Sequence, residues 1–182
     1  MAELDRMTIT LEVTIRLARQ EDLAHLETWQ GFDSAEHRKA LRYYLTAQRI
    51  GSGALLVAEA GGVPVGQLFL WYRRLEASLA DGVETISITA MRVHPEFRRR
   101  GIATRLAQVA EGLARDLGYR WVTIGTDVDN DAAHRLYRSW GYEEFVRNTY
   151  EWDGRHYPQI CLRKRLDHGA GGPEPLGDPG PV

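Results

Sequence analysis

The chain has 182 residues, a formal net charge of -2 at pH 7 and 26% charged residues, which fits one ordinary globular domain. A surface without a large field of either sign argues against charge-driven binding of nucleic acid or of a membrane. The single cysteine, Cys161, excludes an intrachain disulfide and a cysteine-rich metal cluster, and we expect it to be a small buried apolar side chain.

The two ends of the chain differ in composition from its middle. Residues 1–12 lack the basic start and apolar run of a secretory signal, and we expect them to be flexible. The tail at 168–182 is rich in glycine and proline and has little to bury, so we expect disorder there. Residues 13–167 remain as one domain. With no signal, no disulfide and no apolar stretch of ~20 residues, we expect a cytoplasmic protein.

The first half of the domain reads as a strand, two helices and a hairpin of two strands. Ser34 belongs to the residue types that cap helix N-termini, and it precedes the second helix. Gly61 and Gly62 separate two apolar runs, which is a hairpin signal. These elements are expected at 13–17, 20–29, 34–49, 54–60 and 63–71.

The second half alternates strands and helices after a polar excursion at 73–84. The strand at 85–93 has two predicted faces, one with Ile86, Ile88 and Ala90 and the other with Ser87, Thr89, Met91 and Val93. Helices follow at 102–117 and 130–140, and strands at 120–125, 142–152 and 157–165. This order predicts an α/β architecture, a mixed sheet with helices on both faces.

The turn before the helix at 102 breaks a local rule. Arg98, Arg99 and Arg100 precede the helix without an acidic cap, although each cation at a helix N-terminus is unfavourable by ~0.3–1 kcal/mol. A missing external anion would explain this, because free backbone amides between Arg100 and Thr104 would bind phosphate oxygens and Gly101 would let them approach. A solvated run of arginines is the alternative. Neither a Walker loop nor a dinucleotide fingerprint is present.

The pattern Arg98-x-x-Gly101-x-Ala103, after a strand that ends Met91-Arg92-Val93, resembles the Arg/Gln-x-x-Gly-x-Gly/Ala signature of the GNAT superfamily of N-acetyltransferases. The resemblance implies one α/β (α+β) domain with a mixed, mostly antiparallel seven-stranded sheet. It also implies that the turn holds the pyrophosphate of acetyl-CoA and that the strand pairs with its pantetheine arm. The implied cofactor-binding residues here are Met91, Arg92, Val93, Arg98, Arg99, Arg100, Gly101, Ile102, Ala103 and Thr104.

A second match follows downstream, where Asn130, Ala133, Leu136, Tyr137 and Gly141 have the family's Asn-x-x-Ala-x-x-Leu-Tyr-x-x-x-Gly spacing. Asn130 reads as a helix cap, and the resemblance adds a contact with pantetheine. Ala133 would keep the helix surface low beside the cofactor. Tyr137 is implied to be both cofactor-binding and catalytic, as the acid that protonates the departing thiolate. We expect Leu136 and Trp140 in the core.

The resemblance implies direct attack of a primary amine on acetyl-CoA in a ternary complex. The general base stays open among Ser87, Thr89, Glu84, Asp127 and water. A GNAT-fold sensor that binds acyl-CoA without turnover is the main alternative, and nucleic-acid binding through the arginines is a weaker one.

We expect no metal site, because the run of Asp127, Asp129 and Asp131 lacks the glycine and glutamate that a calcium loop needs. The expected partner is a small-molecule or peptide amine, with neither nucleic acid nor membrane, and a homodimer is left open.

Overall fold

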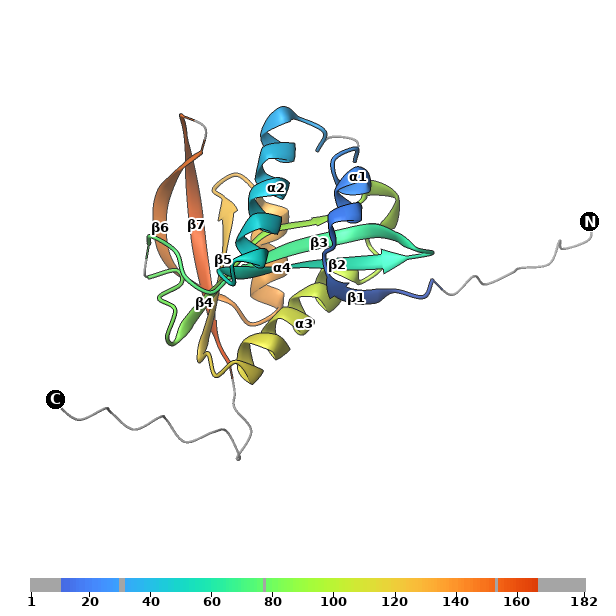
Figure 1. Cartoon of the computed structure of the whole chain (residues 1–182). Coiled ribbons are helices and arrows are strands. Elements are labelled where there is room, and N and C mark those ends of the chain that lie inside the picture. The colour runs from blue at the N-terminus through green and yellow to red at the C-terminus, as the bar shows by residue number, and fades with distance from the viewer. Residues whose placement is uncertain (1–10, 30–31, 77, 153, 167–182) are drawn as a thin grey trace, which may run out of the picture.

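The structure is a computed structural model that describes residues 11–29, 32–76, 78–152 and 154–166. Within them, seven strands form one sheet in the order β1-β2-β3-β4-β5-β7-β6 (Figure 1). Neighbouring strands are antiparallel except β4 and β5, which run parallel. The predicted mixed, mostly antiparallel seven-stranded sheet is therefore confirmed. The strands are β1 (Thr14–Leu17), β2 (Gly53–Ala60), β3 (Val63–Trp71), β4 (Thr85–Val93), β5 (Trp121–Asp127), β6 (Glu143–Trp152) and β7 (Arg155–Arg165).

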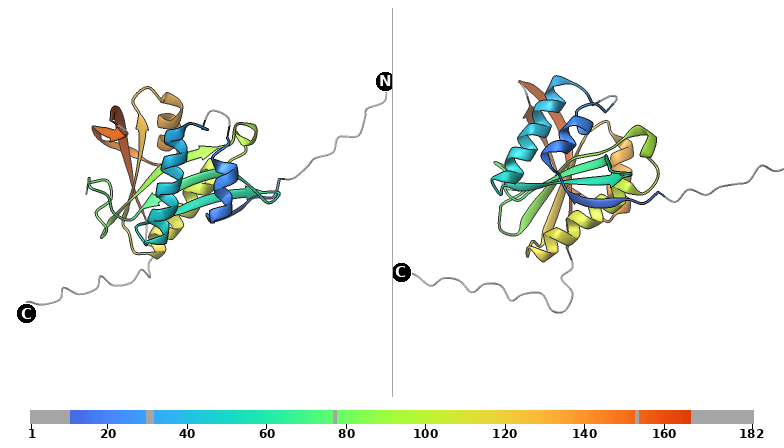
Figure 2. Two further views of the ribbon diagram at one scale, coloured as in Figure 1. Left: turned by 45° about the horizontal axis from the view of Figure 1, so that its top comes forward. Right: turned by 45° about the vertical axis from the view of Figure 1, so that its right-hand side comes forward.

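Helices cover both faces of the sheet, as the sequence predicts (Figure 2). One face carries η1 (Gln20–Asp22), α1 (Leu23–Leu26) and α2 (Ala35–Arg49), and the other carries α3 (Ile102–Asp116) and α4 (Asp131–Ser139). The strand β2 shows the division into two cores, because its side chains alternate. Leu55 and Val57 pack with residues of α1 and α2, whereas Leu56 and Ala58 pack with residues of α3.

Local sequence signals position several of these elements. The Ser34 hydroxyl accepts a hydrogen bond from the His37 amide at 3.1 Å and caps α2, as expected. Gly66 on β3 has no space for a side chain, since a Cβ there would lie 2.9 Å from Ile102 and 3.1 Å from Leu106. This close approach seats the start of α3 directly on the sheet. Cys161 is buried on β7, as predicted, and burial raises the pKa of its thiol to about 11.

The strand β4 contains a bulge that the sequence pattern does not reveal. Between the pairs Gln67–Arg92 and Phe69–Thr89, two residues of β4 face one residue of β3, and Ala90 has a φ of 53°. The bulge reverses the alternation. Met91 and Val93 therefore pack with Ile86 and Ile88 against the α3 core, not on the face of Ser87 and Thr89 as predicted.

Other expectations need smaller corrections. The first helix is shorter than expected, since α1 ends at Leu26 and the buried Trp29 lies beyond it. Leu136 was expected in the core but is 38% exposed. Of the predicted flexible segment 1–12, only residues 11–12 lie in the described ranges, and the predicted disordered tail at 168–182 lies outside them. No helix within the described ranges is long and apolar enough to cross a membrane.

Candidate functional site

The parallel strands β4 and β5 separate halfway along their length. Their register runs from Thr85–Trp121 to Ile88–Ile124 and includes no later pair. The bulge at Ala90 and the continued pairing of Gly125 to Asp127 with β7 carry the two strands apart. The edge of β4 from residue 89 to 93 thus offers backbone groups to an extended ligand, as an unpaired strand does.

The turn after β4 leads directly to this opening. It consists of η2 (Pro95–Phe97), the three arginines and Gly101, whose φ of 77° is the left-handed conformation that favours glycine. The first backbone bond of α3 runs from the Arg105 amide to the Gly101 carbonyl at 2.9 Å. The amides of residues 102–104 therefore have no acceptor within the helix.

The arginines of this turn are exposed, and none forms an ion pair with a described residue. The Arg98 side chain donates from Nε to the Val93 carbonyl at 3.1 Å, which ties the turn to the end of β4. The Arg100 guanidinium lies 5.7 Å from the centre of the Phe97 ring. Positive charge and free amides thus gather where α3 begins, which is the arrangement that binds phosphate groups.

Two predicted residues of α4 lie at its first turn. The Asn130 side chain accepts from the Ala133 amide at 3.1 Å, so the expected helix cap is present. Ala133 is partly buried and packs against the same core as Met91 and Val93. The sequence motifs of β4 and α4, about forty residues apart, therefore meet on one side of the sheet.

Tyr137 lies about two turns after the start of α4. Its side chain is 8% exposed and its ring lies 5.6 Å from that of Trp140 and 6.5 Å from that of Tyr142. Burial raises the pKa of the Tyr137 phenol to about 12, so the phenol keeps its proton at neutral pH. A protonated phenol is the form that can donate a hydrogen bond or a proton.

The candidate bases lie at different ends of the site. Glu84 precedes β4, and its carboxylate accepts from Arg120 at 3.1 Å. With a strand rise of ~3.3 Å per residue, it lies roughly 20 Å along the strand from Met91 and is out of reach. Asp127 ends β5 and is exposed beside the opening, where it also borders a cavity of about 250 Å³ with Tyr157 and Pro158. Ser87 is buried and Thr89 is half-buried on β4.

Arg92 lies on a different face from its predicted neighbours. Its guanidinium lies 4.8 Å from the centre of the Phe32 ring and contacts Nδ1 of His37 on α2. The side chain thus points away from α3, towards the face that α2 covers. The resemblance implies a cofactor-binding role for Arg92, which stays a prediction; its side chain lies on the face opposite to that of Met91 and Val93.

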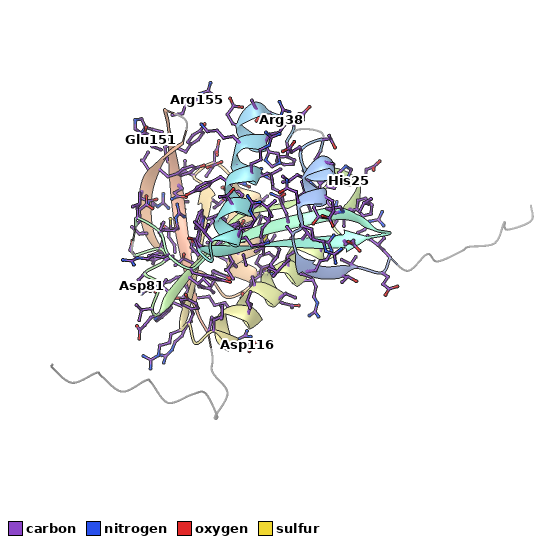
Figure 3. All side chains as sticks on the ribbon, in the orientation of Figure 1. His25, Arg38, Asp81, Asp116, Glu151 and Arg155 are labelled. Carbon is purple, nitrogen blue, oxygen red and sulfur yellow. The ribbon has the colours of Figure 1, made fainter. Side chains whose placement is uncertain are left out.

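The same face holds aromatic residues from distant elements. Tyr44 of α2 stacks on Phe69 with ring centres 4.7 Å apart, and Tyr150 of β6 stacks on Tyr157 of β7 at 5.1 Å. Figure 3 shows Arg38 on α2 and Glu151 and Arg155 on the β6–β7 hairpin at the same end of the molecule, opposite Asp116. Sequence reasoning missed His37 as a site residue, because nothing in its spacing links it to Arg92.

The described residues include no group of three His, Cys, Asp or Glu side chains placed to hold a metal ion.

Comparisons with known proteins agree on one family. The protein-family model described as "Acetyltransferase (GNAT) family" matches residues 20–142. An uncharacterized N-acetyltransferase of Methanocaldococcus jannaschii is 30% identical over 142 residues, 72% of this chain, and the chain spans only 61% of that protein's length. An aminoglycoside N(6')-acetyltransferase type 1 of Salmonella enteritidis is 26% identical over 138 residues, which cover 71% of this chain and 92% of that protein.

Solved structures share the fold. A putative acetyltransferase of Salmonella typhimurium, solved with its cofactor acetyl-CoA, superposes with a TM-score of 0.63 at 23% identity. The superposition covers 88% of this chain and 98% of the other.

Proposed function

The chain belongs to the acetyltransferase (GNAT) family, and on this premise we propose that it transfers an acetyl group from acetyl-CoA to a primary amine. The observation that carries the proposal is the start of α3, where free amides and three exposed arginines adjoin an unpaired strand edge. A small-molecule or peptide amine is the proposed acceptor.

The turn fits a diphosphate in both charge and space. A Cβ added at Gly101 would meet no atom within 4 Å, so the space beside this residue is open. Residues 102–104 would donate their amides to phosphate oxygens, and Arg99 and Arg100 would add charge-assisted hydrogen bonds. Arg98 would chiefly hold the turn against Val93, given its bond to that carbonyl.

The open edge of β4 would hold the pantetheine arm. An extended amide chain can pair with strand backbone between Met91 and Val93, in the manner of an added strand. The thioester would then lie between β4 and β5, where an amide near Met91 can polarise its carbonyl oxygen. Asn130 and Ala133 would border the arm from the side of α4.

The chemical step needs no covalent enzyme intermediate. The amine nitrogen bonds to the thioester carbon, the carbon–sulfur bond breaks, and the sulfur leaves as a thiolate that accepts a proton. Tyr137 would supply that proton, or a hydrogen bond in its place, from a phenol that stays protonated at neutral pH. Cys161 is buried on β7, outside both motifs, and takes no part.

The incoming amine must lose a proton before it can attack. For an alkyl amine with a pKa of ~10.4, the neutral form costs roughly 4–5 kcal/mol at pH 7. Asp127, at the end of β5, would accept that proton directly or through a water. Ser87 and Thr89 can only relay it, because a hydroxyl is not a base at neutral pH.

The experiment is an assay of free CoA released from acetyl-CoA in the presence of a panel of primary amines. Amine-dependent release by the wild type supports the proposal. Binding of acetyl-CoA with no release across the panel would favour the alternative, an acyl-CoA sensor with the same fold.

A further inference from the structure

One half-buried charge, that of Arg92, lies on the face of the sheet that α2 covers. Arg92 lies on β4 within the proposed site, and its guanidinium interacts, among the described residues, with His37 Nδ1 and with the Phe32 ring. Its electrostatic neighbours are the phenols of Tyr44 and Tyr150. No carboxylate of a described residue forms an ion pair with it.

These neighbours are neutral at physiological pH. Burial and the adjacent Arg92 charge lower the pKa of His37 to about 4, so its Nδ1 acts as a hydrogen-bond acceptor. Burial raises the pKa of both Tyr44 and Tyr150. Arginine cannot lose its own proton in a protein, so a positive charge is held among neutral groups.

Another partly buried arginine of the chain, Arg16, is paired with carboxylates. Arg16 lies between Asp22, at 2.7 and 2.8 Å, and Glu59, at 2.5 Å. Buried charges are normally paired in this way, because the removal of a charge from water costs free energy unless an opposite charge compensates it. Arg92 has five N–H donors and uses one on His37, so its remaining donors are available to a ligand.

A second polar group beside Arg92 also has unused capacity. Gln67 pairs with Arg92 in the register of β3 and β4, so the two side chains share a face. Gln67 is fully buried, and its Oε1 has no hydrogen-bond partner among the described residues. Buried polar atoms are normally satisfied, so an unsatisfied one calls for an explanation such as a bound water or ligand.

We propose that Arg92 binds an anionic group on the acceptor, so that the substrate is a small amine with a carboxylate near its nitrogen, as in an amino acid. The proposal rests on the proposed function for the reaction itself. Arg92 adjoins Met91, where the thioester carbonyl is expected, and its side chain points to the opposite face of the strand. If the carboxylate binds there, only a few covalent bonds can separate it from the reacting nitrogen. The planar guanidinium can donate two parallel hydrogen bonds to a carboxylate.

The acceptor class can be tested with matched pairs of amines that differ only in the carboxylate. Phenylalanine is compared with 2-phenylethylamine and with phenylalanine methyl ester, and leucine with 3-methylbutylamine. Both kcat/KM and the thermal shift of the protein saturated with CoA are measured. The wild type should favour the free amino acids by roughly 10- to 100-fold, the range that charge-assisted hydrogen bonds supply. Kanamycin, a polycation, should be a poor acceptor.

Arg92→Met removes the charge and keeps an unbranched side chain, and it should abolish this preference by raising KM for the amino acids. Arg92→Lys keeps the charge without the fork and should retain part of the preference, which guards against simple misfolding of the first variant. Arg42→Met is the matched control, because Arg42 is an exposed arginine of α2 paired with Glu27 at 2.9 Å. It should retain the full preference.

Equal shifts and rates for amino acids and their decarboxylated amines in the wild type would overturn the proposal. An undiminished preference in Arg92→Met would overturn it as well. The thermal shift separates this proposal from the proposed function, since carboxylate-dependent binding without CoA release would defeat only the latter.

Discussion

Ile88 of β4 faces Ile124 of β5 in the last register position that these two parallel strands share. Two residues later, Ala90 adopts a φ of 53°, and β4 turns its Met91 side chain to the α3 core. The bulge therefore helps to separate the two strands and sets which side chains of β4 face α3 and which face α2. Strain of this kind is commonly kept at functional sites.

Replacement of the strained residue should relieve the strain. A left-handed conformation costs a non-glycine residue ~1–2 kcal/mol, and glycine avoids that cost. Ala90→Gly should therefore raise the midpoint of thermal unfolding by a few degrees or leave it unchanged, while Ala90→Val should lower it. A calorimetric scan of both variants that gave the reverse order would show that the bulge is absent.

The glycine before α3 should matter for the cofactor more than for the fold. Gly101→Ala should lower the midpoint of unfolding by roughly 2–8 °C, because a φ of 77° is strained for alanine. A clash adds nothing, since no atom lies within 4 Å of the new Cβ. It should also weaken acetyl-CoA binding by about tenfold or more. Gly118→Ala is the control, since Gly118 has a φ of 86°, equally open surroundings and a place at the other end of α3. The affinity of the Gly118→Ala variant for acetyl-CoA should stay at the wild-type value.

Removal of the proposed acid should slow turnover without loss of cofactor. Tyr137→Phe should lower kcat by about 10²-fold or more, the usual contribution of a positioned acid, with acetyl-CoA affinity unchanged. Tyr119→Phe, beyond the far end of α3, should retain wild-type kcat. Since the pKa of Tyr137 is raised to about 12, its acid form persists up to that pH, and this group should cause no fall in rate between pH 7 and 10. An unchanged kcat in Tyr137→Phe would remove it from the mechanism.

Away from the site, the Arg16–Asp22 pair should make stability depend on pH. Burial acts to raise the pKa of Asp22, but hydrogen bonds from Arg16 and from the Arg19 amide outweigh it and hold that pKa below its usual value. A depressed pKa contributes stability that is complete above about pH 4 and disappears as the pH falls through the folded-state value. Asp22→Asn should therefore cost ~3 kcal/mol at pH 7 and less below pH 4, measured by urea unfolding. Glu27→Gln, in an exposed pair with Arg42, should cost under ~1 kcal/mol at either pH.

The sequence predicts the site best where local chemistry decides the structure. Three arginines before a glycine and a helix can be recognised without coordinates, since helix ends bind anions whatever surrounds them. The cap at Asn130 follows from its residue type in the same way. Alternation predicts the faces of β4 only as far as Thr89, because a bulge depends on the pairing with β3.

The contacts of Arg92 could not be predicted from the sequence, for a related reason. The contact between Arg92 and His37 joins two elements 55 residues apart, and neither residue type specifies the other. The sequence predicts Leu136 in the core, whereas the short α4 leaves it 38% exposed. Burial of this kind depends on how elements pack, which a single chain's pattern does not contain.

The most direct test of the account is calorimetric titration of acetyl-CoA into the wild type and into the double variant Arg99→Glu, Arg100→Glu. The control is Arg49→Glu with Arg155→Glu, which changes the net charge equally on other elements. We predict saturable heat for the wild type and the control, and an affinity lower by at least about a hundredfold for the variant in the turn. No heat with the wild type, or equal affinities for all three proteins, would contradict the claim that the start of α3 binds the diphosphate of acetyl-CoA.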